Sequence, residues 1–265
     1  MYKRQVVGAI EWNLFRDGRY LEACESGDPH TAVARICWPA LGWTGNLKHD
    51  KNIAEQPFYR HYTHRFMCKK LGHGSNYGGK PNTLAQQSRL PIGIVNTFQP
   101  LYFRSFPAHL QWQEWVTEQI RKFGYLISLT GRKRQFWGRR NDEATIREAI
   151  AYDPQCSLAE IVNTAMLNIW RASITPLMLQ DHDALTFMYR EEQEDEVVPK
   201  LQASLVVPVP LEHGRELRIP YDAKVGWNRG DYNAKTNPDG LKDYVQGGEQ
   251  RRRSKAVGIM DRKLR

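Results

Sequence analysis

The segment at residues 65–79, RFMCKKLGHGSNYGG, constrains this chain more than any other. One helix face would carry a functional side chain at every fourth position: Arg65, Lys69, His73 and Tyr77. Two cations followed by two flat rings suit a ligand with a polyphosphate at one end and a ring at the other. Four glycines interleave with this stripe and would let a nucleotide or duplex approach the backbone. The alternative is a solvated basic helix, but each glycine costs it about 1 kcal/mol relative to alanine.

The charge of the chain points the same way. A net charge of +9 and a pI near 9.4 favour a polyanionic partner. Residues 131–140, GRKRQFWGRR, interleave cations with two aromatics, a composition that suits a nucleic-acid backbone and a stacking surface. The alternatives are a basic protein without such a partner and a loop that binds nothing.

Cysteine usage and hydropathy bear on the compartment. The four cysteines form no CxxC pair, which predicts free thiols in a reducing compartment: Cys24, Cys37, Cys68 and Cys156. No apolar run approaches the roughly eighteen residues of a membrane helix. We therefore expect a soluble, cytoplasmic protein that does not bind a membrane.

Periodicity and punctuation predict an α+β chain, with helices early and a small antiparallel sheet late. The helices are expected at 13–37, 62–77, 107–123, 144–172 with an interruption near Pro154, and 191–201. Strands are expected at 125–130, 205–209 and 216–219, with a hairpin of 177–180 and 185–189. Residues 38–57 are predicted to be an irregular insertion, and residues 237–265 a polar basic tail.

The tip of the predicted hairpin is the most metal-like site in the sequence. Asp181 and Asp183 flank His182 there. Magnesium takes hard oxygen ligands and leaves places for substrate phosphates, so Asp183 is the candidate ligand. Ordinary turn chemistry of aspartate is the alternative reading. His182 as a general base or zinc ligand is the weaker hypothesis.

Four motifs follow one another in the chain: RFMCKKLGHGSNYG at 65–78, GY…T…GRKR at 124–134, R-x-A-x-A-Y-x-P-Q at 147–155 and QDHD at 180–183. DPHT at 28–31 precedes them and KVGWN at 224–228 follows. This ordered set resembles the C-terminal fingers and palm portion of family A (DNA polymerase I-like) DNA polymerases, most closely the phage-encoded branch. The resemblance implies helical fingers and a small antiparallel palm sheet, without thumb or exonuclease domain.

The resemblance also implies roles for the stripe. Arg65 and Lys69 would contact the triphosphate of the incoming dNTP, and Lys69 would donate a proton to the leaving group. His73 stands where many members have phenylalanine or tyrosine and would serve as the platform beside the sugar. Tyr77 would stack near the template base, and His30 would contact the dNTP.

For the nucleic acid and the metal, the resemblance implies a second set of residues. Arg147 and Gln155 would touch the minor groove of the primer–template. DNA contacts are also expected from the basic turn and the hairpin tip: Arg132, Arg134 and His182. Asp183 would be a catalytic metal ligand, and Ala184 replaces the glutamate that usually follows it.

The family pattern divides the chain into a remnant of the palm strand near motif A (1–12), fingers (13–145), palm (146–236) and the tail (237–265). The second metal-binding aspartate of the family, in motif A, would fall near Tyr2, yet residues 1–5 contain no carboxylate. Glu11 and Asp17 are the nearest candidates, and both lie in or beside predicted helix. The resemblance therefore predicts either a separate polypeptide that supplies motif A, thumb and exonuclease, or a shortened gene.

The function implied is template-directed DNA synthesis, a nucleotidyl transfer from dNTP to the primer 3′-hydroxyl that uses two Mg²⁺ ions. The chain would act as part of a split or truncated polymerase, encoded by a phage and acting in a bacterial host. One alternative is a catalytically incomplete fragment that binds DNA and dNTP and needs a partner chain. The other is a basic structural nucleic-acid-binding protein.

Overall fold

The computed structural model of the chain describes residues 2–181 and 183–244. The chain divides into two compact units, Met1–Ile219 and Pro220–Arg265, and each is described by itself.

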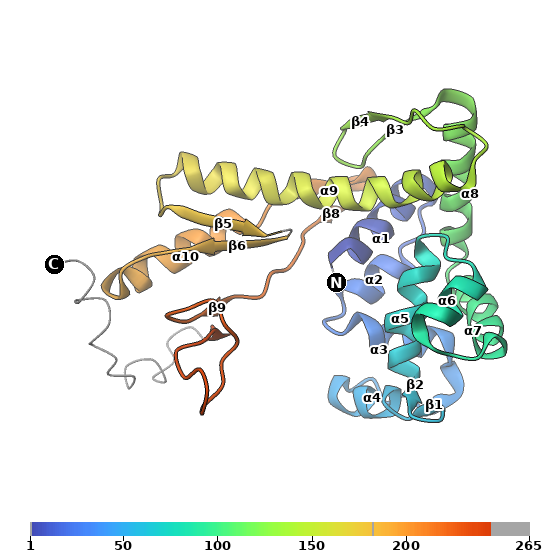
Figure 1. The fold of residues 1–265 in the computed structure, drawn as a ribbon, viewed down its shortest axis with the longest axis horizontal. Coiled ribbons are helices and arrows are strands. Elements are labelled where there is room, and N and C mark those ends of the chain that lie inside the picture. The colour runs from blue at the N-terminus through green and yellow to red at the C-terminus, as the bar shows by residue number, and fades with distance from the viewer. Residues whose placement is uncertain (1, 182, 245–265) are drawn as a thin grey trace. The chain divides into compact units, whose positions relative to one another are not determined.

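The first unit is built mainly from helices (Figure 1). Its α-helices are α1 (Tyr2–Phe15), α2 (Arg19–Glu25), α3 (Pro29–Cys37), α4 (Leu47–Ala54), α5 (His64–Asn76), α6 (Pro81–Ser88), α7 (Ile92–Ser105), α8 (Pro107–Phe123), α9 (Glu143–Arg171) and α10 (Glu194–Leu205). Its short 3-10 helices are η1 (Pro39–Leu41), η2 (Glu191–Gln193) and η3 (Glu212–Gly214).

Short strands punctuate these helices and pair in sequence order. The strands of the first unit are β1 (Pro57–Tyr59), β2 (Tyr62–Thr63), β3 (Tyr125–Ile127), β4 (Lys133–Gln135), β5 (Leu177–Asp181), β6 (Ala184–Phe187), β7 (Val209–Pro210) and β8 (Glu216–Leu217). Each forms an antiparallel two-stranded sheet with its neighbour in the chain. The predicted α+β composition and the predicted hairpin around residues 181–184 are confirmed.

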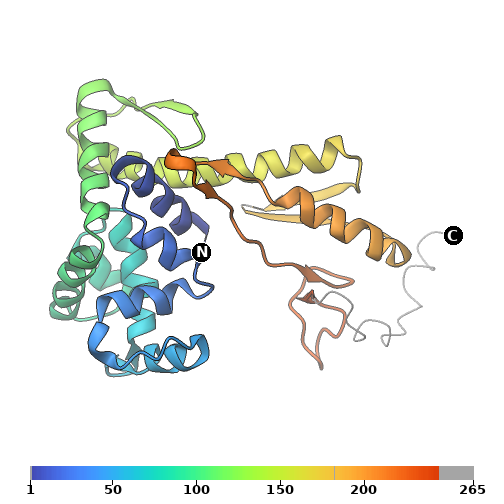
Figure 2. The same ribbon diagram turned by 180° about the vertical axis from the view of Figure 1, so that it is seen from behind.

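Two groups of buried side chains hold the unit together. The larger lies among α1, α2, α3, α5, α7, α8 and the first half of α9, and includes Tyr20, Phe98, Tyr102, Phe106 and Trp112. The smaller joins Ile169 of α9 to Val197 and Leu201 of α10, with Phe187 of β6 packed against them. α9 contacts α1 and α8 as well as α10, so this helix connects the two groups (Figure 2).

The N-terminal residues differ from the expectation of a palm strand at 1–12. They form α1, whose residues 4–11 are all buried, with Val6, Val7, Ala9 and Ile10 in the main core. Gly8 lets α1 pack closely on α2, since a Cβ at this position would lie 2.6 Å from the backbone nitrogen of Leu21.

The interruption predicted near Pro154 is absent, and α9 runs from Glu143 to Arg171 with Pro154 inside it. Proline deprives one carbonyl of a helical partner, but buried residues before it (Ala149, Ile150) and after it (Ile161) keep both halves in one helix. Residues 38–57 are also more regular than predicted. They contain η1 and α4, and the side chain of Asn46 caps α4 by accepting from the amides of Lys48 and His49.

The described part of the second unit is small. Its strands β9 (Lys224–Val225) and β10 (Lys242–Asp243) are antiparallel. Side-chain amides of Asn228 and Asn237 hydrogen-bond to each other within the intervening turns, at 2.9 Å and 3.0 Å. Most of the predicted tail, residues 245–265, lies outside the described residues.

Two further predictions concern the cysteines and membrane-spanning helices. All four cysteines are free thiols, as predicted. Among the helices of the described residues, none combines the length and the apolar character that crossing a membrane requires.

Candidate nucleotide and nucleic-acid site

Helix α5 carries the stripe and is anchored at both ends. The Thr63 side chain caps its first turn by accepting from the amide of Phe66 at 3.1 Å. At its C-terminal end, the side chain of Gln113 in α8 donates to the carbonyls of Ser75 (2.8 Å) and Asn76 (3.1 Å). These bonds satisfy groups that a helix end leaves unpaired, so the position of α5 is tied to α8.

The two faces of α5 differ in burial. Met67, Cys68 and Leu71 point into the core, whereas Lys69 and His73 are exposed and Arg65 is half-buried. Tyr77 is the C-terminal cap, and its ring meets that of His73 edge-on at 5.1 Å between centroids. The structure thus gathers the four stripe residues along one side of α5.

Arg65 is held by carboxylates from two other segments. Its guanidinium donates two hydrogen bonds of 3.2 Å to Asp28, and it forms an ion pair of 3.5 Å with Glu55. Asp28 also caps α3, accepting from the amide and hydroxyl of Thr31. Burial opposes ionisation of Asp28, but the bonds from Arg65 and Thr31 prevail and lower its pKa.

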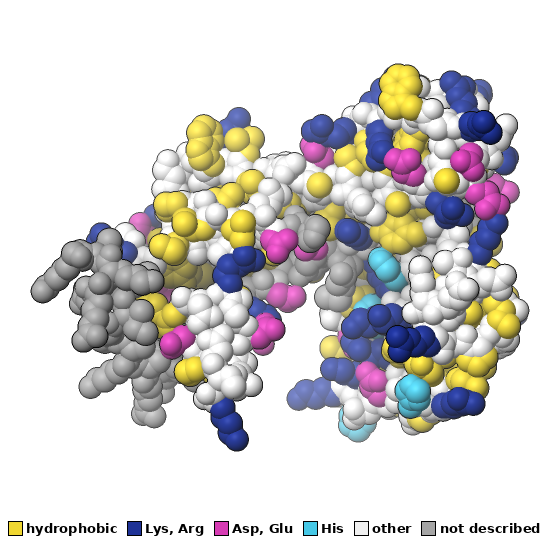
Figure 3. Space-filling view, in the orientation of Figure 1, with side chains coloured by type: hydrophobic (Ala, Val, Ile, Leu, Met, Phe, Trp, Pro, Cys, Tyr) yellow, Lys and Arg dark blue, Asp and Glu magenta, His cyan; other side chains and the backbone are white. Residues whose placement is uncertain are grey.

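His30 lies in the first turn of α3, next to this ion pair. Its pKa is lowered to about 3, first by burial and then by the charges of Arg4, Arg65 and Lys69. The predicted dNTP residues of α5 and His30 therefore come together from two helices. Figure 3 shows basic and histidine side chains gathered over this part of the helical unit.

Tyr77 has a polar end without a partner. Its hydroxyl is buried and makes no hydrogen bond within residues 2–181 and 183–244, and burial raises its pKa to about 12. A neutral tyrosine in this setting offers a ring face and one free donor.

The glycines around the stripe have a different role from the predicted one. A Cβ at Gly74 would lie 2.3 Å from the side chain of Leu84, and one at Gly79 would lie 2.7 Å from the carbonyl oxygen of Gly74. A Cβ at Gly72 would lie 3.1 Å from the Tyr102 ring. The expectation that glycines admit a ligand to the backbone is therefore wrong at these three positions, where internal packing requires them.

Four of the five residues predicted to bind DNA are exposed and lie on or beside α9. Arg132, directly before strand β4, forms an ion pair with Glu160 of α9. Arg134, within β4, forms an ion pair with Glu148 of the same helix. Arg147 forms an ion pair of 3.5 Å with Glu143 one turn earlier. Gln155 is also exposed on α9, about 12 Å along the helix from Arg147 at 1.5 Å per residue.

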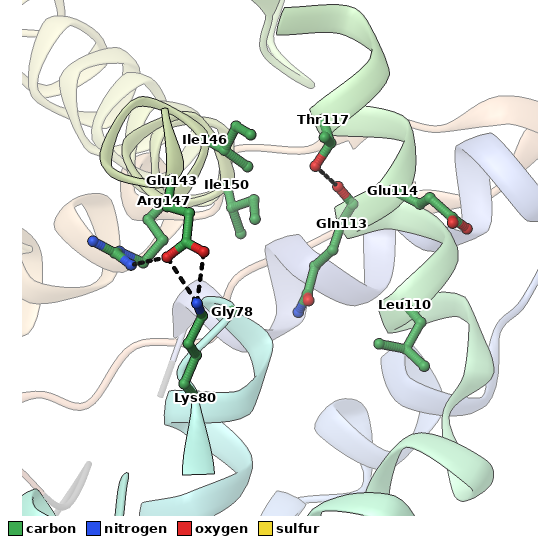
Figure 4. A pocket seen from close by; sticks show the side chains of 10 residues that line it. All are labelled: Gly78, Lys80, Leu110, Gln113, Glu114, Thr117, Glu143, Ile146, Arg147 and Ile150. Carbon is green, nitrogen blue, oxygen red and sulfur yellow. Dashed lines mark hydrogen bonds and ion pairs between the residues drawn. The ribbon is translucent and has the colours of Figure 1, made fainter. Parts of the chain in front are cut away.

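A cavity of about 460 Å³ opens between the end of α5, α8 and α9. Figure 4 shows its lining, with Lys80, Glu143 and Arg147 joined on one side. Lys80 is bound to Glu143 at 2.6 Å, so two cations share one carboxylate. Apolar walls come from Leu110, Ile146 and Ile150. Ile146 and Ile150 lie on the same helix as Glu143 and Arg147, and α8 adds Gln113, Glu114 and Thr117 beside Leu110, so charged, polar and apolar side chains are mixed in this lining.

Asp183 lies exposed at the tip of the β5–β6 hairpin, where Asp181 pairs with Ala184. His182, the other predicted residue of this tip, lies outside the described residues. No group of three His, Cys, Asp or Glu side chains that could hold a metal ion occurs in the described parts of the chain. The carboxylate of Asp183 is suited to provide one oxygen ligand to Mg²⁺. The described residues of the hairpin tip do not provide enough ligands for two ions.

Comparison with known proteins identifies the family. The model of "DNA polymerase family A" matches residues 53–232, more than half of the chain. The chain belongs to DNA polymerase family A. It is 30% identical to DNA polymerase I of Treponema pallidum (strain Nichols) over 169 residues, which are 59% of this chain and 16% of that protein. It is 28% identical over 174 residues to the thermostable DNA polymerase I of Thermus filiformis, covering 62% of this chain and 20% of that protein.

A solved family A structure is also similar. It is the POL domain of Pol1 from M. smegmatis in complex with DNA primer-template and dNTP, with a TM-score of 0.56 and 25% identity. The similarity covers 76% of this chain and 35% of that chain. The present chain thus spans about a fifth or less of the curated family A relatives described above. These relatives are bacterial, and the phage branch stays a prediction.

Sequence reasoning missed several residues of this site. Asp28 belongs to the DPHT motif. Its bond to Arg65, which lies 37 residues later in the chain, cannot be inferred from the sequence pattern. Gln113 and Arg4 carry no motif at all. Arg4 contacts both His30 and the backbone of α5.

Proposed function

We propose that this chain binds dNTP and primer–template DNA and takes part in template-directed nucleotidyl transfer to a primer 3′-hydroxyl. The observation that carries the proposal is the exposed face of α5, with Arg65, Lys69, His73 and Tyr77 beside His30 of α3. The M. smegmatis domain with a similar fold is described as a complex with both of these ligands.

The charge pattern of the site supports the assignment of the triphosphate end. Lys69 is exposed and has no carboxylate partner within the described residues, so its ammonium is available to phosphate oxygens. Arg65 is already held in place by Asp28 and Glu55, which leaves a fixed guanidinium at a half-buried position. The rings of His73 and Tyr77 follow along α5 and would lie against the sugar and the base.

The duplex would bind along α9. Arg132, Arg134 and Arg147 are each paired with a glutamate of α9, and phosphates would compete with these carboxylates for the same guanidinium groups. Gln155 would reach the minor groove, and His182 the primer end.

The reaction in this family is expected to use Mg²⁺, with Asp183 as one ligand. A second candidate is a fragment that binds DNA and dNTP and needs a separate polypeptide with further carboxylates, since no group of three His, Cys, Asp or Glu side chains that could hold a metal ion occurs among the described residues. A phage-encoded split polymerase would have this arrangement.

The nucleotide assignment is tested by dNTP binding to wild type and Lys69→Ala. Loss of one charge-assisted contact, worth roughly 1.5–3 kcal/mol, should weaken binding by about 10- to 150-fold, while primer–template affinity stays the same. Lys70→Ala is the matched control, since Lys70 is an exposed lysine on the same helix and outside the stripe. Equal losses in both variants would rule out the assignment.

Primer extension with Mg²⁺ and four dNTPs separates the two candidates. Extension by the wild type that Asp183→Ala abolishes would establish a self-sufficient polymerase. Retained binding of primer–template and dNTP without extension would establish the incomplete fragment. A protein that binds neither ligand specifically would contradict both.

A further inference from the structure

Arg4 of α1 is a buried cation whose partners are not carboxylates. Only 4% of the residue is exposed, and no ion pair of Arg4 occurs within the described residues. One terminal nitrogen, Nη2, donates to the carbonyl oxygens of Lys69 (2.6 Å) and Cys68 (3.3 Å) in the middle of α5. The other, Nη1, lies 3.0 Å from Nδ1 of His30.

The contact between Arg4 and His30 determines which imidazole nitrogen carries the proton. A guanidinium has donors only and stays protonated in proteins. Nδ1 of His30 must therefore accept, which leaves the single proton of the neutral ring on Nε2. Nε2 makes no hydrogen bond in the part of the chain that the structure describes, so this donor is available to a ligand.

The surroundings of His30 keep the ring in this state. The charged groups that face it come from three elements: Arg4 of α1, Asp28 at the N-terminus of α3, and Arg65 and Lys69 of α5. The single carboxylate is engaged by Arg65, and three cations oppose a further positive charge. Burial, the largest cause, and these cations together lower the pKa of His30 to about 3, so the ring is neutral near pH 7.

We propose that Arg4 is a positioning residue for the nucleotide: it holds His30 as a neutral Nε2–H donor toward the phosphates and fixes the backbone of α5 at Lys69. The inference rests on the proposed function for its ligand, but the tautomer can be measured without any nucleotide. Arg4 itself is buried and acts through His30 and α5.

The first test is the tautomer of His30 in the full chain labelled with ¹⁵N-histidine. Long-range ¹H–¹⁵N correlation spectra distinguish the two ring nitrogens, and comparison with His30→Gln assigns the signals. The expected wild-type result is a bare Nδ1 and a protonated Nε2, unchanged from pH 8 to pH 5.5. A proton on Nδ1, or titration of His30 between these pH values, would overturn the inference without reference to dNTP.

The second test compares dATP binding by wild type, Arg4→Met and Arg4→Lys. Methionine keeps the length but removes the charge, so the pKa of His30 should rise above its wild-type value, while burial and the charges of Arg65 and Lys69 still hold it below the ordinary value. We expect about tenfold weaker binding at pH 7.5 in Arg4→Met, because Nδ1 of His30 no longer faces a fixed donor and the ring no longer keeps its single proton on Nε2. Arg4→Lys should keep His30 neutral and retain most of the affinity.

Arg104→Met serves as the control for removing an arginine elsewhere, because Arg104 is exposed at the end of α7. An Arg4→Met protein that is less stable but keeps the wild-type tautomer and pH profile would show a merely structural role and overturn the inference. If the tautomer is as expected but wild type does not bind dATP, the proposed function fails and the nucleotide role of Arg4 fails with it.

Discussion

Asp153 is a carboxylic acid buried inside α9, one residue before Pro154. One of its oxygens accepts from the amide of Leu129 and the hydroxyl of Ser157, both at 2.8 Å. Burial raises its pKa to about 6 although both hydrogen bonds favour the charged form. Asp153 thus joins the β3–β4 segment to α9 with a group whose ionisation is costly.

This residue makes stability depend on pH. A folded-state pKa above the unfolded value gives stability that is fully present below about pH 4 and is lost as pH rises through about 6. Asp153→Asn keeps the accepting oxygen and removes the charge. We expect it to stabilise the protein by on the order of 2 kcal/mol at pH 8, and by about 1 kcal/mol less at pH 5.

Urea unfolding of wild type and Asp153→Asn at the two pH values measures this difference. Asp142→Asn is the control, because Asp142 is an exposed acid that caps the same helix. An Asp153→Asn effect that is the same at pH 5 and pH 8 would contradict the assignment of this pH dependence to Asp153.

Between elements, a buried pair joins α1 to α8. Nδ1 of His109 hydrogen-bonds to Glu11, and both side chains are essentially inaccessible to solvent. The other ring nitrogen of His109 lies 3.1 Å from the Tyr102 hydroxyl, which donates to Asn76 at the end of α5. Glu11, a sequence-level candidate for the missing metal ligand, is therefore committed to a structural network that ends at the stripe helix.

Removal of the Glu11 carboxylate should be strongly destabilising, since it leaves His109 buried without its partner. We expect Glu11→Ala to lower the free energy of unfolding by about 3 kcal/mol and Glu11→Gln by less. Glu114→Ala, which removes an exposed acid of α8 outside this pair, should change the free energy of unfolding by less than about 0.5 kcal/mol. Denaturant midpoints of the three variants and the wild type measure these changes in stability. A Glu11→Ala protein as stable as the wild type would refute the structural role of Glu11.

For the whole molecule, the excess of positive charge governs binding to a polyanion. The net charge is +9, and exposed arginines lie along the β3–β4 and α9 side of the first unit. Each phosphate contact releases a counterion, so affinity should fall steeply with salt concentration. The ion pairs that Arg132 and Arg134 make with α9 reduce the net gain, because these bonds break when phosphate binds.

Primer–template affinity measured from 50 to 300 mM salt tests this prediction. Replacing Arg132 and Arg134 together by alanine should reduce the slope of log K against log salt by about 2. The double variant of Arg104 and Arg121, two exposed arginines of α7 and α8, should keep the wild-type slope. An equal reduction in both double variants would indicate a general charge effect instead of a defined interface.

The family, the helix that carries the stripe and the hairpin that carries Asp183 follow from the amino-acid sequence alone. These features are local: a four-residue period places Arg65, Lys69, His73 and Tyr77 on one side of α5, and apolar runs around a short polar turn specify β5 and β6. The roles of Arg65, Lys69 and Asp183 in binding follow from family resemblance and stay predictions.

Features that depend on distant partners emerge only in the folded chain. Burial against α2 makes residues 2–15 a helix instead of a palm strand, and packing on both sides carries α9 through Pro154. Leu84 and Tyr102 explain the stripe glycines, and Arg4 reaches α5 across 65 residues of sequence. Such contacts depend on how folded elements meet in space, so no spacing along the chain encodes them.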